Sequence, residues 1–183
     1  MTDATKTTAH ATPRDGSARP HRGGGDRSRR SSGPQRDDRR SEFAQKIIGM
    51  RRVARVMAGG RRFNFSVAMV LGDKKGRVGV GVGKANDTAL AIEKATRDAK
   101  KNMITLNLTK TQSIPHEVEA KYCASVVTIR PSKGRGLVAG SAVRIVLELA
   151  GVTDITAKLQ SRSKNPINNA RAAIVALRAV SKK

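Results

Sequence analysis

The sequence predicts an α+β protein in which two folded domains follow a long N-terminal arm. Residues 1–42 contain no Val, Ile, Leu or Phe and are rich in Arg, Ser, Gly and Pro. Such a stretch cannot bury a core, so we expect a disordered basic arm. Beyond the arm, period-two strand patterns and helical patterns follow one another twice. They predict one domain at residues 43–110 and a second at residues 111–183.

The first domain is expected to contain three strands and a helix. Residues 51–56 suggest a short strand, and a glycine-containing turn follows it. Residues 63–71 alternate as a second strand, and we expect Phe63 and Phe65 to lie in the core with the other odd-numbered residues. A charged loop at residues 72–76 leads to the third strand.

The third strand carries the run GRVGVGVGK, which resembles a nucleotide-binding loop. Its spacing fits neither common motif, because Val78 stands where a P-loop requires glycine and Lys84 stands where a dinucleotide fingerprint requires one. Valines and glycines instead alternate through residues 78–83, so the glycines share one face of the strand. A bare strand face lets a helix approach closely. We predict that the following helix, about residues 87–104, packs there through its alanines, and that the chain is not a nucleotide-dependent enzyme.

The second domain is expected to contain strands and two helices. The expected elements are two strands within 114–129, a glycine-rich turn at 131–136, a helix at 141–151, a strand within 152–160 and a helix at 165–180. Gly151 predicts the end of the first helix, and Pro166 the first residue of the second helix after an Asn165 cap. Arg144 and Glu148 are spaced for an ion pair on the outer surface of the first helix.

The net charge predicts a polyanionic partner. The chain carries 37 Lys and Arg against 14 Asp and Glu, a formal charge of +23. Nucleic acid is the first candidate for such a partner. A membrane is disfavoured, because no apolar stretch approaches the roughly 20 residues that span a bilayer and no basic helix has a large exposed apolar face.

A cluster of basic residues in the first domain is the candidate RNA site. Each Arg or Lys can neutralise a phosphate, and two glycines in the first turn let the backbone approach the nucleic acid. Because we expect Phe63 and Phe65 in the core, we expect no base-stacking platform. The pattern favours recognition of folded RNA by phosphate contacts and shape. The predicted RNA-binding residues are Arg51, Arg52, Arg55, Gly59, Gly60, Arg61, Arg62, Lys74, Lys75, Arg77 and Lys84.

No catalytic site, metal site or cofactor is predicted. Cys123 is the only cysteine, which excludes an intrachain disulfide and fits an intracellular setting, and we expect it to be a small packed residue. His116 and Glu117 begin like a zinc-protease motif, but Ala120 replaces the second histidine.

Four segments resemble the bacterial form of small-subunit ribosomal protein five, at residues 52–87, 114–122, 139–152 and 163–177. The resemblance implies a first domain similar to a double-stranded-RNA-binding fold and a second compact αβ domain. It implies a cytoplasmic structural protein of the small ribosomal subunit, bound to 16S-type rRNA near the neck. The loop at residues 57–61 would reach rRNA in the head and border the spectinomycin pocket, so that a change there alters drug sensitivity.

The resemblance also implies partners. These are ribosomal proteins four and eight and the messenger RNA that enters the subunit, with contributions to subunit assembly and decoding accuracy. Arg144 falls on a family position at the contact with protein four, and Gly134, Arg135 and Gly136 lie in the neighbouring turn.

The sequence departs from the family pattern in three places. The turn after Pro131 is one residue shorter, Val82 stands where an aromatic residue is common, and the arm is longer than in many members. A free RNA chaperone with the same fold is the alternative, and co-sedimentation with the small subunit would separate the two.

Overall fold

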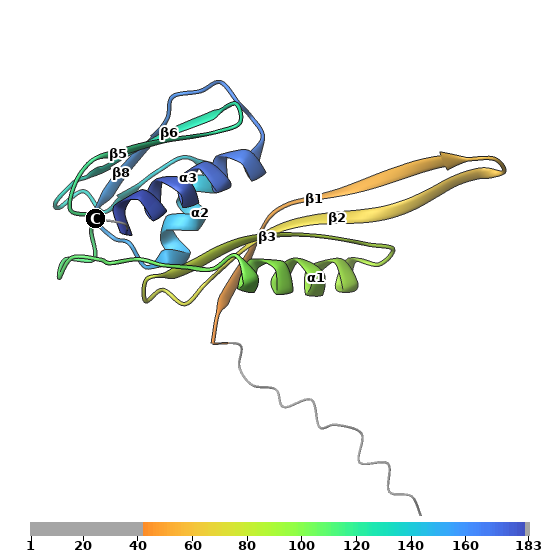
Figure 1. Cartoon of the computed structure of the whole chain (residues 1–183), viewed down its shortest axis with the longest axis horizontal. Helices are drawn as coiled ribbons and strands as arrows, with labels where there is room; N and C mark the ends of the chain where they lie inside the picture. Colours follow the sequence, from red (N-terminus) through yellow and green to blue (C-terminus); the bar gives the residue numbers. More distant parts are fainter. Residues whose placement is uncertain (1–41, 182–183) are drawn as a thin grey trace, which may run out of the picture. The chain divides into compact units, whose positions relative to one another are not determined.

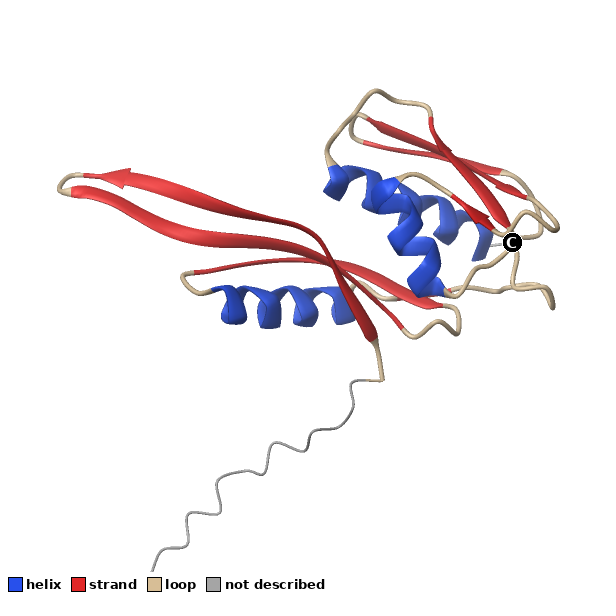
Figure 2. Cartoon of the chain, turned by 180° about the vertical axis from the view of Figure 1, so that it is seen from behind, coloured by secondary structure: helices blue, strands red, loops and turns tan. Residues whose placement is uncertain are grey.

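The computed structural model describes residues 42–181, which lie in one compact unit spanning Asp38–Lys183. The predicted arm therefore falls outside the described residues except for its last residue. The elements in chain order are β1 (Ala44–Met57), β2 (Gly60–Gly72), β3 (Arg77–Ala85), α1 (Thr88–Lys101), β4 (Ile104–Thr105), β5 (Val118–Tyr122), β6 (Ser125–Pro131), β7 (Leu137–Val138), α2 (Ser141–Ala150), β8 (Ile155–Leu159) and α3 (Pro166–Ser181) (Figures 1 and 2).

The first sheet is antiparallel, in the order β1-β2-β3-β4, and α1 covers one of its faces (Figure 1). The predicted three strands and helix are present, and the two-residue strand β4 adds a fourth partner. β1 is 14 residues long rather than a short strand at 51–56. Most of β1 is exposed, so its sequence does not need to alternate between apolar and polar residues. Without that alternation, the sequence does not reveal the full length of the strand.

The packing of α1 on β3 is as the glycine pattern predicts. Ala91, Ala95 and Ala99 have no exposed surface, and they lie against the glycine face of β3. The helix begins where expected, because the Asp87 carboxylate accepts a hydrogen bond from the Thr88 backbone N–H at 2.7 Å.

The second sheet has the order β5-β6-β8-β7, with β7 parallel to β8. β7 has only two residues, too few to show a period in the sequence. α2 and α3 contact strands of both sheets, and a single hydrophobic cluster includes Val80 of the first sheet, Val146 of α2 and Leu177 of α3. The predicted helix ends are confirmed: Gly151 has φ +80°, and Asn165 Oδ1 accepts from the Ile167 N–H at 3.2 Å.

The loop between β2 and β3 joins the two halves of the folded unit. The Lys74 N–H donates to the Leu149 carbonyl and the Gly76 N–H to the Ala150 carbonyl, each at 3.0 Å. These carbonyls end α2 and have no partner within their own helix. The loop therefore caps the C-terminus of α2 from another part of the chain.

Three predictions about side chains are wrong. Phe63 is 45% exposed, because the β1–β2 hairpin extends past the last pairing with β3 and beyond the end of α1. Cys123 is exposed in the turn between β5 and β6, where its φ is +50°. Glu148 pairs with Lys46 of β1 at 3.5 Å, and not with Arg144.

Candidate nucleic-acid interface

The β1–β2 hairpin presents the densest group of predicted RNA-binding residues. β2 pairs with β3 only from Phe65 onward, so the hairpin beyond that residue has no third strand (Figure 1). Its turn consists of Ala58 and Gly59. Gly59 and the next residue, Gly60, have φ of +92° and +138°, and a Cβ at either would meet nothing within 4 Å. The backbone conformation thus requires these glycines, and the turn is open to a partner.

The register gathers four cations on the face of the hairpin opposite α1. Arg55 is directly opposite Arg62, while Arg51 and Lys84 flank Ser66 on either side. Directly paired residues share a face. The residues of β2 that pair with the helix-facing glycines of β3 lie on the α1 side of the sheet. The four cations are offset by one position from that side, so they lie on the face away from α1.

The other face of the hairpin carries Arg52 and Arg61 together with Phe63. The guanidinium carbon of Arg52 lies 4.5 Å from the centroid of the Phe63 ring, which is a cation–π contact. Arginines therefore project from both faces of the same exposed hairpin.

The electrostatics of the hairpin are unbalanced. No Asp or Glu occurs between Phe43 and Gly72, and none of the ion pairs among the described residues involves the hairpin arginines. Like charges directly opposite on neighbouring strands destabilise a sheet, because their Cβ atoms are only about 5 Å apart. The pair Arg55–Arg62 is unfavourable in the free protein and becomes favourable next to a polyanion.

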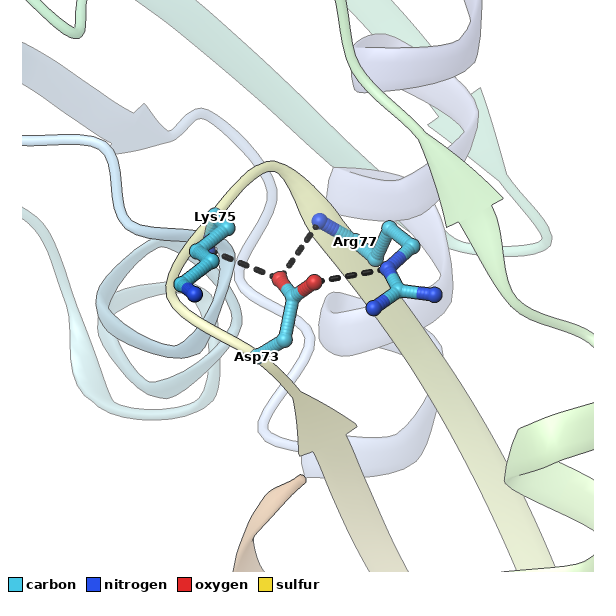
Figure 3. Close-up of polar contacts among 3 residues, drawn as sticks. All are labelled: Asp73, Lys75 and Arg77. Atoms are coloured by element: carbon cyan, nitrogen blue, oxygen red, sulfur yellow. Dashed lines mark hydrogen bonds and ion pairs between the residues drawn. The ribbon is translucent and has the colours of Figure 1, made fainter. Parts of the chain in front are cut away.

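The structure separates Lys74, Lys75 and Arg77 from the hairpin group, because they lie at the opposite end of β2. Asp73 organises this loop (Figure 3). Its Oδ1 accepts from the backbone N–H of Lys75 at 2.7 Å and of Arg77 at 3.0 Å, and its Oδ2 accepts from Arg77 Nε at 2.6 Å. Arg77 also lies over the ring of Phe43, at 5.2 Å. Arg77 therefore has a structural role of its own.

The contacts of Asp73 shift its pKa. Burial of the carboxylate, whose side chain is 5% exposed, acts to raise the pKa. The hydrogen bonds from Arg77 and Lys75 and the charge of Arg77 act in the other direction and prevail, so the pKa lies below its ordinary value of 3.8.

The predicted contact with a protein partner maps to the turn before β7 and to α2. Gly134 and Gly136 have φ of +76° and +66°, and a Cβ on either would meet nothing within 4 Å. Arg135 and Arg144 are exposed. The turn and the first turn of α2 therefore both offer free surface.

Two asparagines that the sequence did not single out lie near the hairpin arginines. A surface hollow of about 460 Å³ is lined by Arg55, Met57, Arg62, Phe63, Asn64 and Asn86. Asparagine amides can donate to phosphate oxygens. Their grouping depends on strand register, which no local sequence signal reveals.

Residues 42–181 contain no group of three or more His, Cys, Asp or Glu placed to hold a metal ion. No helix within that range is long and apolar enough to cross a membrane.

Comparison with known proteins identifies the family. The model described as ribosomal protein S5, N-terminal domain, matches residues 43–107, and the model of the C-terminal domain matches residues 120–183. The small ribosomal subunit protein uS5c of Cyanophora paradoxa is 46% identical over 141 residues, which cover 76% of this chain and 83% of the relative. The uS5 proteins of Synechococcus elongatus and Thermosynechococcus vestitus are 46% and 43% identical, over 78% and 82% of this chain and 79% and 87% of their own.

These matches confirm the predicted two-domain α+β fold class. They also confirm the resemblance to small-subunit ribosomal protein five that the sequence showed. The chain belongs to the ribosomal protein S5 family and is a structural ribosomal protein rather than an enzyme.

Proposed function

We propose that this protein is a constituent of the cytoplasmic small ribosomal subunit and binds 16S-type rRNA through its β1–β2 hairpin. The observation that carries the proposal is the like-charged pair Arg55–Arg62 in a segment, Phe43 to Gly72, that contains no carboxylate. An RNA backbone supplies the missing negative charge.

The physical basis of binding is neutralisation of phosphates. Each Arg or Lys that pairs with a phosphate releases condensed counterions, and this release drives association and makes it dependent on salt. With arginines on both faces and an open turn at Gly59 and Gly60, the hairpin can enter between RNA segments and contact phosphates on each side. Recognition of this kind reads the shape of folded RNA.

The charged loop at the other end of β2 is a second, separate contact in this proposal. Lys74 and Lys75 are exposed on a loop that Asp73 and the end of α2 hold rigid. Arg77 is 47% exposed and can reach a phosphate while its Nε remains with Asp73.

The finer assignments from the family resemblance are part of the proposal. We assign Gly134, Arg135, Gly136 and Arg144 to a contact with ribosomal protein four, which would link this chain to decoding accuracy. Ribosomal protein eight and incoming messenger RNA are the other proposed neighbours. The positive φ and free surroundings of the two glycines support a turn kept open for a partner. We place the domain boundary between residues 110 and 111.

Co-sedimentation tests the proposed function. The tagged full-length protein should travel with small subunits at equal stoichiometry and dissociate only at high salt, because its contacts are ionic and distributed. A free RNA chaperone would sediment mainly away from subunits at moderate salt, and that result would refute the ribosomal assignment. Crosslinking within intact subunits would then show which rRNA nucleotides lie beside the hairpin.

A further inference from the structure

We propose that Phe63 stacks against an unpaired nucleobase of the bound RNA, with Arg52 holding its ring in position. The inference rests on the proposed RNA binding by the hairpin and adds a contact with a base to the contacts with phosphates.

The exposure of Phe63 is the first observation. Phe65, on the same face of β2, pairs opposite Ala85 and packs against a cluster with Val67 and Ala91. Phe63 lies one step further along the hairpin, past the last pairing with β3, and is 45% exposed. A large aromatic residue that would ordinarily be buried is thus nearly half exposed.

The contact with Arg52 is the second observation. Its guanidinium carbon lies 4.5 Å from the ring centroid, so it occupies one side of the ring. In this proposal, the cation–π contact favours one orientation of the ring in the free protein. A base that stacks on the remaining side would complete a sandwich of guanidinium, phenyl ring and base without having to order the side chain first.

The surroundings select a nucleobase over an apolar protein surface. Arg61 lies on the same face of the hairpin as Phe63, and the residues opposite them on β1 include no Asp or Glu. An apolar partner would have to desolvate these guanidinium groups, whereas RNA offers a phosphate and a ring from one nucleotide. Bases within a duplex hide their faces, so the base must be unpaired, in a bulge, loop or end.

Replacement of the ring tests the stacking. In Phe63→Leu the side chain remains apolar but has no ring face, and it lies outside the core, so the fold should be retained. Titration with a transcript of the small-subunit rRNA should show affinity about tenfold lower at every salt concentration. The slope of log affinity against log salt should not change, because stacking releases no counterions. Val56→Ala, at a 75%-exposed position on the same face, is the matched control and should bind like the wild type.

A fluorescent replacement provides a direct reading. The chain contains no Trp, so Phe63→Trp introduces a single indole that can still stack. Its emission should be quenched when the rRNA transcript binds, with affinity at or above that of the wild type. Val175→Trp, on α3 and 38% exposed, is the control for quenching unrelated to the hairpin and should change little.

The outcomes separate this inference from the proposed function. If Phe63→Leu binds RNA with the affinity of the wild type, the stacking is refuted while phosphate binding by the hairpin stands. The same holds if the variant changes the slope of log affinity against log salt and does not lower the affinity equally at every salt concentration. Unchanged emission of Phe63→Trp in an RNA complex would refute it as well. If the wild-type protein binds the transcript without salt dependence, the proposed function itself fails.

Discussion

A Cβ atom on Gly81 of β3 would lie 2.2 Å from the carbonyl oxygen of Ala95 in α1. Gly79 has the same relation to Ala99, at 2.3 Å, and Gly83 to Ala91, at 2.2 Å. Alternate residues of a strand are about 6.6 Å apart, and every fourth residue of a helix is about 6 Å further along its axis. The row of glycines on β3 and the row of alanines on α1 therefore have nearly the same spacing. The helix backbone lies directly on the strand.

The first prediction concerns this contact. Gly81→Ala should lower the free energy of unfolding by about 3 kcal/mol, because a methyl group would meet backbone atoms that move only if the whole helix moves. Gly49→Ala in β1 is the matched control, since its Cβ would have only the Pro166 side chain nearby, at 4.0 Å, and it should be nearly neutral. Urea denaturation measures both. Equal stabilities would contradict the direct packing of helix on strand.

The glycine contact also shows why parts of the fold could be predicted. Valine and glycine alternate within one short stretch, and alanines recur every four residues nearby, so both partners of the contact carry local signals. The length of β1 carried none, because a strand outside the core needs no alternation. The prediction that Phe63 lies in the core was wrong for a related reason. Phe63 is on the same face of β2 as the buried Val67, but the sequence does not show where along the strand α1 stops covering that face.

The candidate site was predictable in composition but not in arrangement. The arginines and the open turn follow from the sequence. The opposition of Arg55 to Arg62 requires the hairpin register, which the two-residue turn sets. The partner of Glu148 likewise lay about a hundred residues away, where helical spacing had suggested Arg144.

The second prediction concerns the junction between the β2–β3 loop and α2. Gly151 has φ +80°, and its Cβ would lie 2.1 Å from the Lys74 carbonyl oxygen. Gly151→Ala should therefore destabilise the protein through both backbone strain and a clash. Amide exchange at Lys74 and Gly76 should accelerate, because these groups donate to the end of α2. Hydrogen exchange read out by NMR measures this.

The matched control for that junction is Gly134→Ala. Gly134 has a similar φ of +76°, but nothing lies within 4 Å of its Cβ. Gly134→Ala should lower the free energy of unfolding by only about 1–2 kcal/mol, which is the cost of an alanine in the left-handed conformation. If both variants lose the same stability, then the loop does not pack tightly on α2.

The third prediction concerns pH. Because the pKa of Asp73 is lower in the folded protein, its contribution to stability is complete above the ordinary value of 3.8 and is lost as pH falls through the folded pKa. Asp73→Asn should lower the free energy of unfolding by about 2 kcal/mol at pH 7, since the charged hydrogen bonds to Arg77 are lost. Below pH 3.8 the wild type should approach the variant. Urea denaturation between pH 6 and pH 3 measures this.

A charge-matched control accompanies the pH series. Glu93→Gln removes a carboxylate from an exposed ion pair with Arg97 and should change stability by at most about 0.5 kcal/mol. A wild type and Asp73→Asn that remain separated by a constant amount down to pH 3 would show that the Asp73 charge does not stabilise the loop.

The fourth prediction concerns the hairpin cations. Replacing Arg55 and Arg62 by alanine should reduce the slope of log affinity for rRNA against log salt by about 1.4–1.8, which corresponds to two lost phosphate contacts. The same variant should unfold at an equal or higher temperature, because it relieves the like-charge pair in the free protein. Arg97→Ala with Arg130→Ala removes the same charge from exposed ion pairs elsewhere and should leave the slope nearly unchanged. Equal slopes for the two double variants would mean that binding depends on total charge rather than on this hairpin.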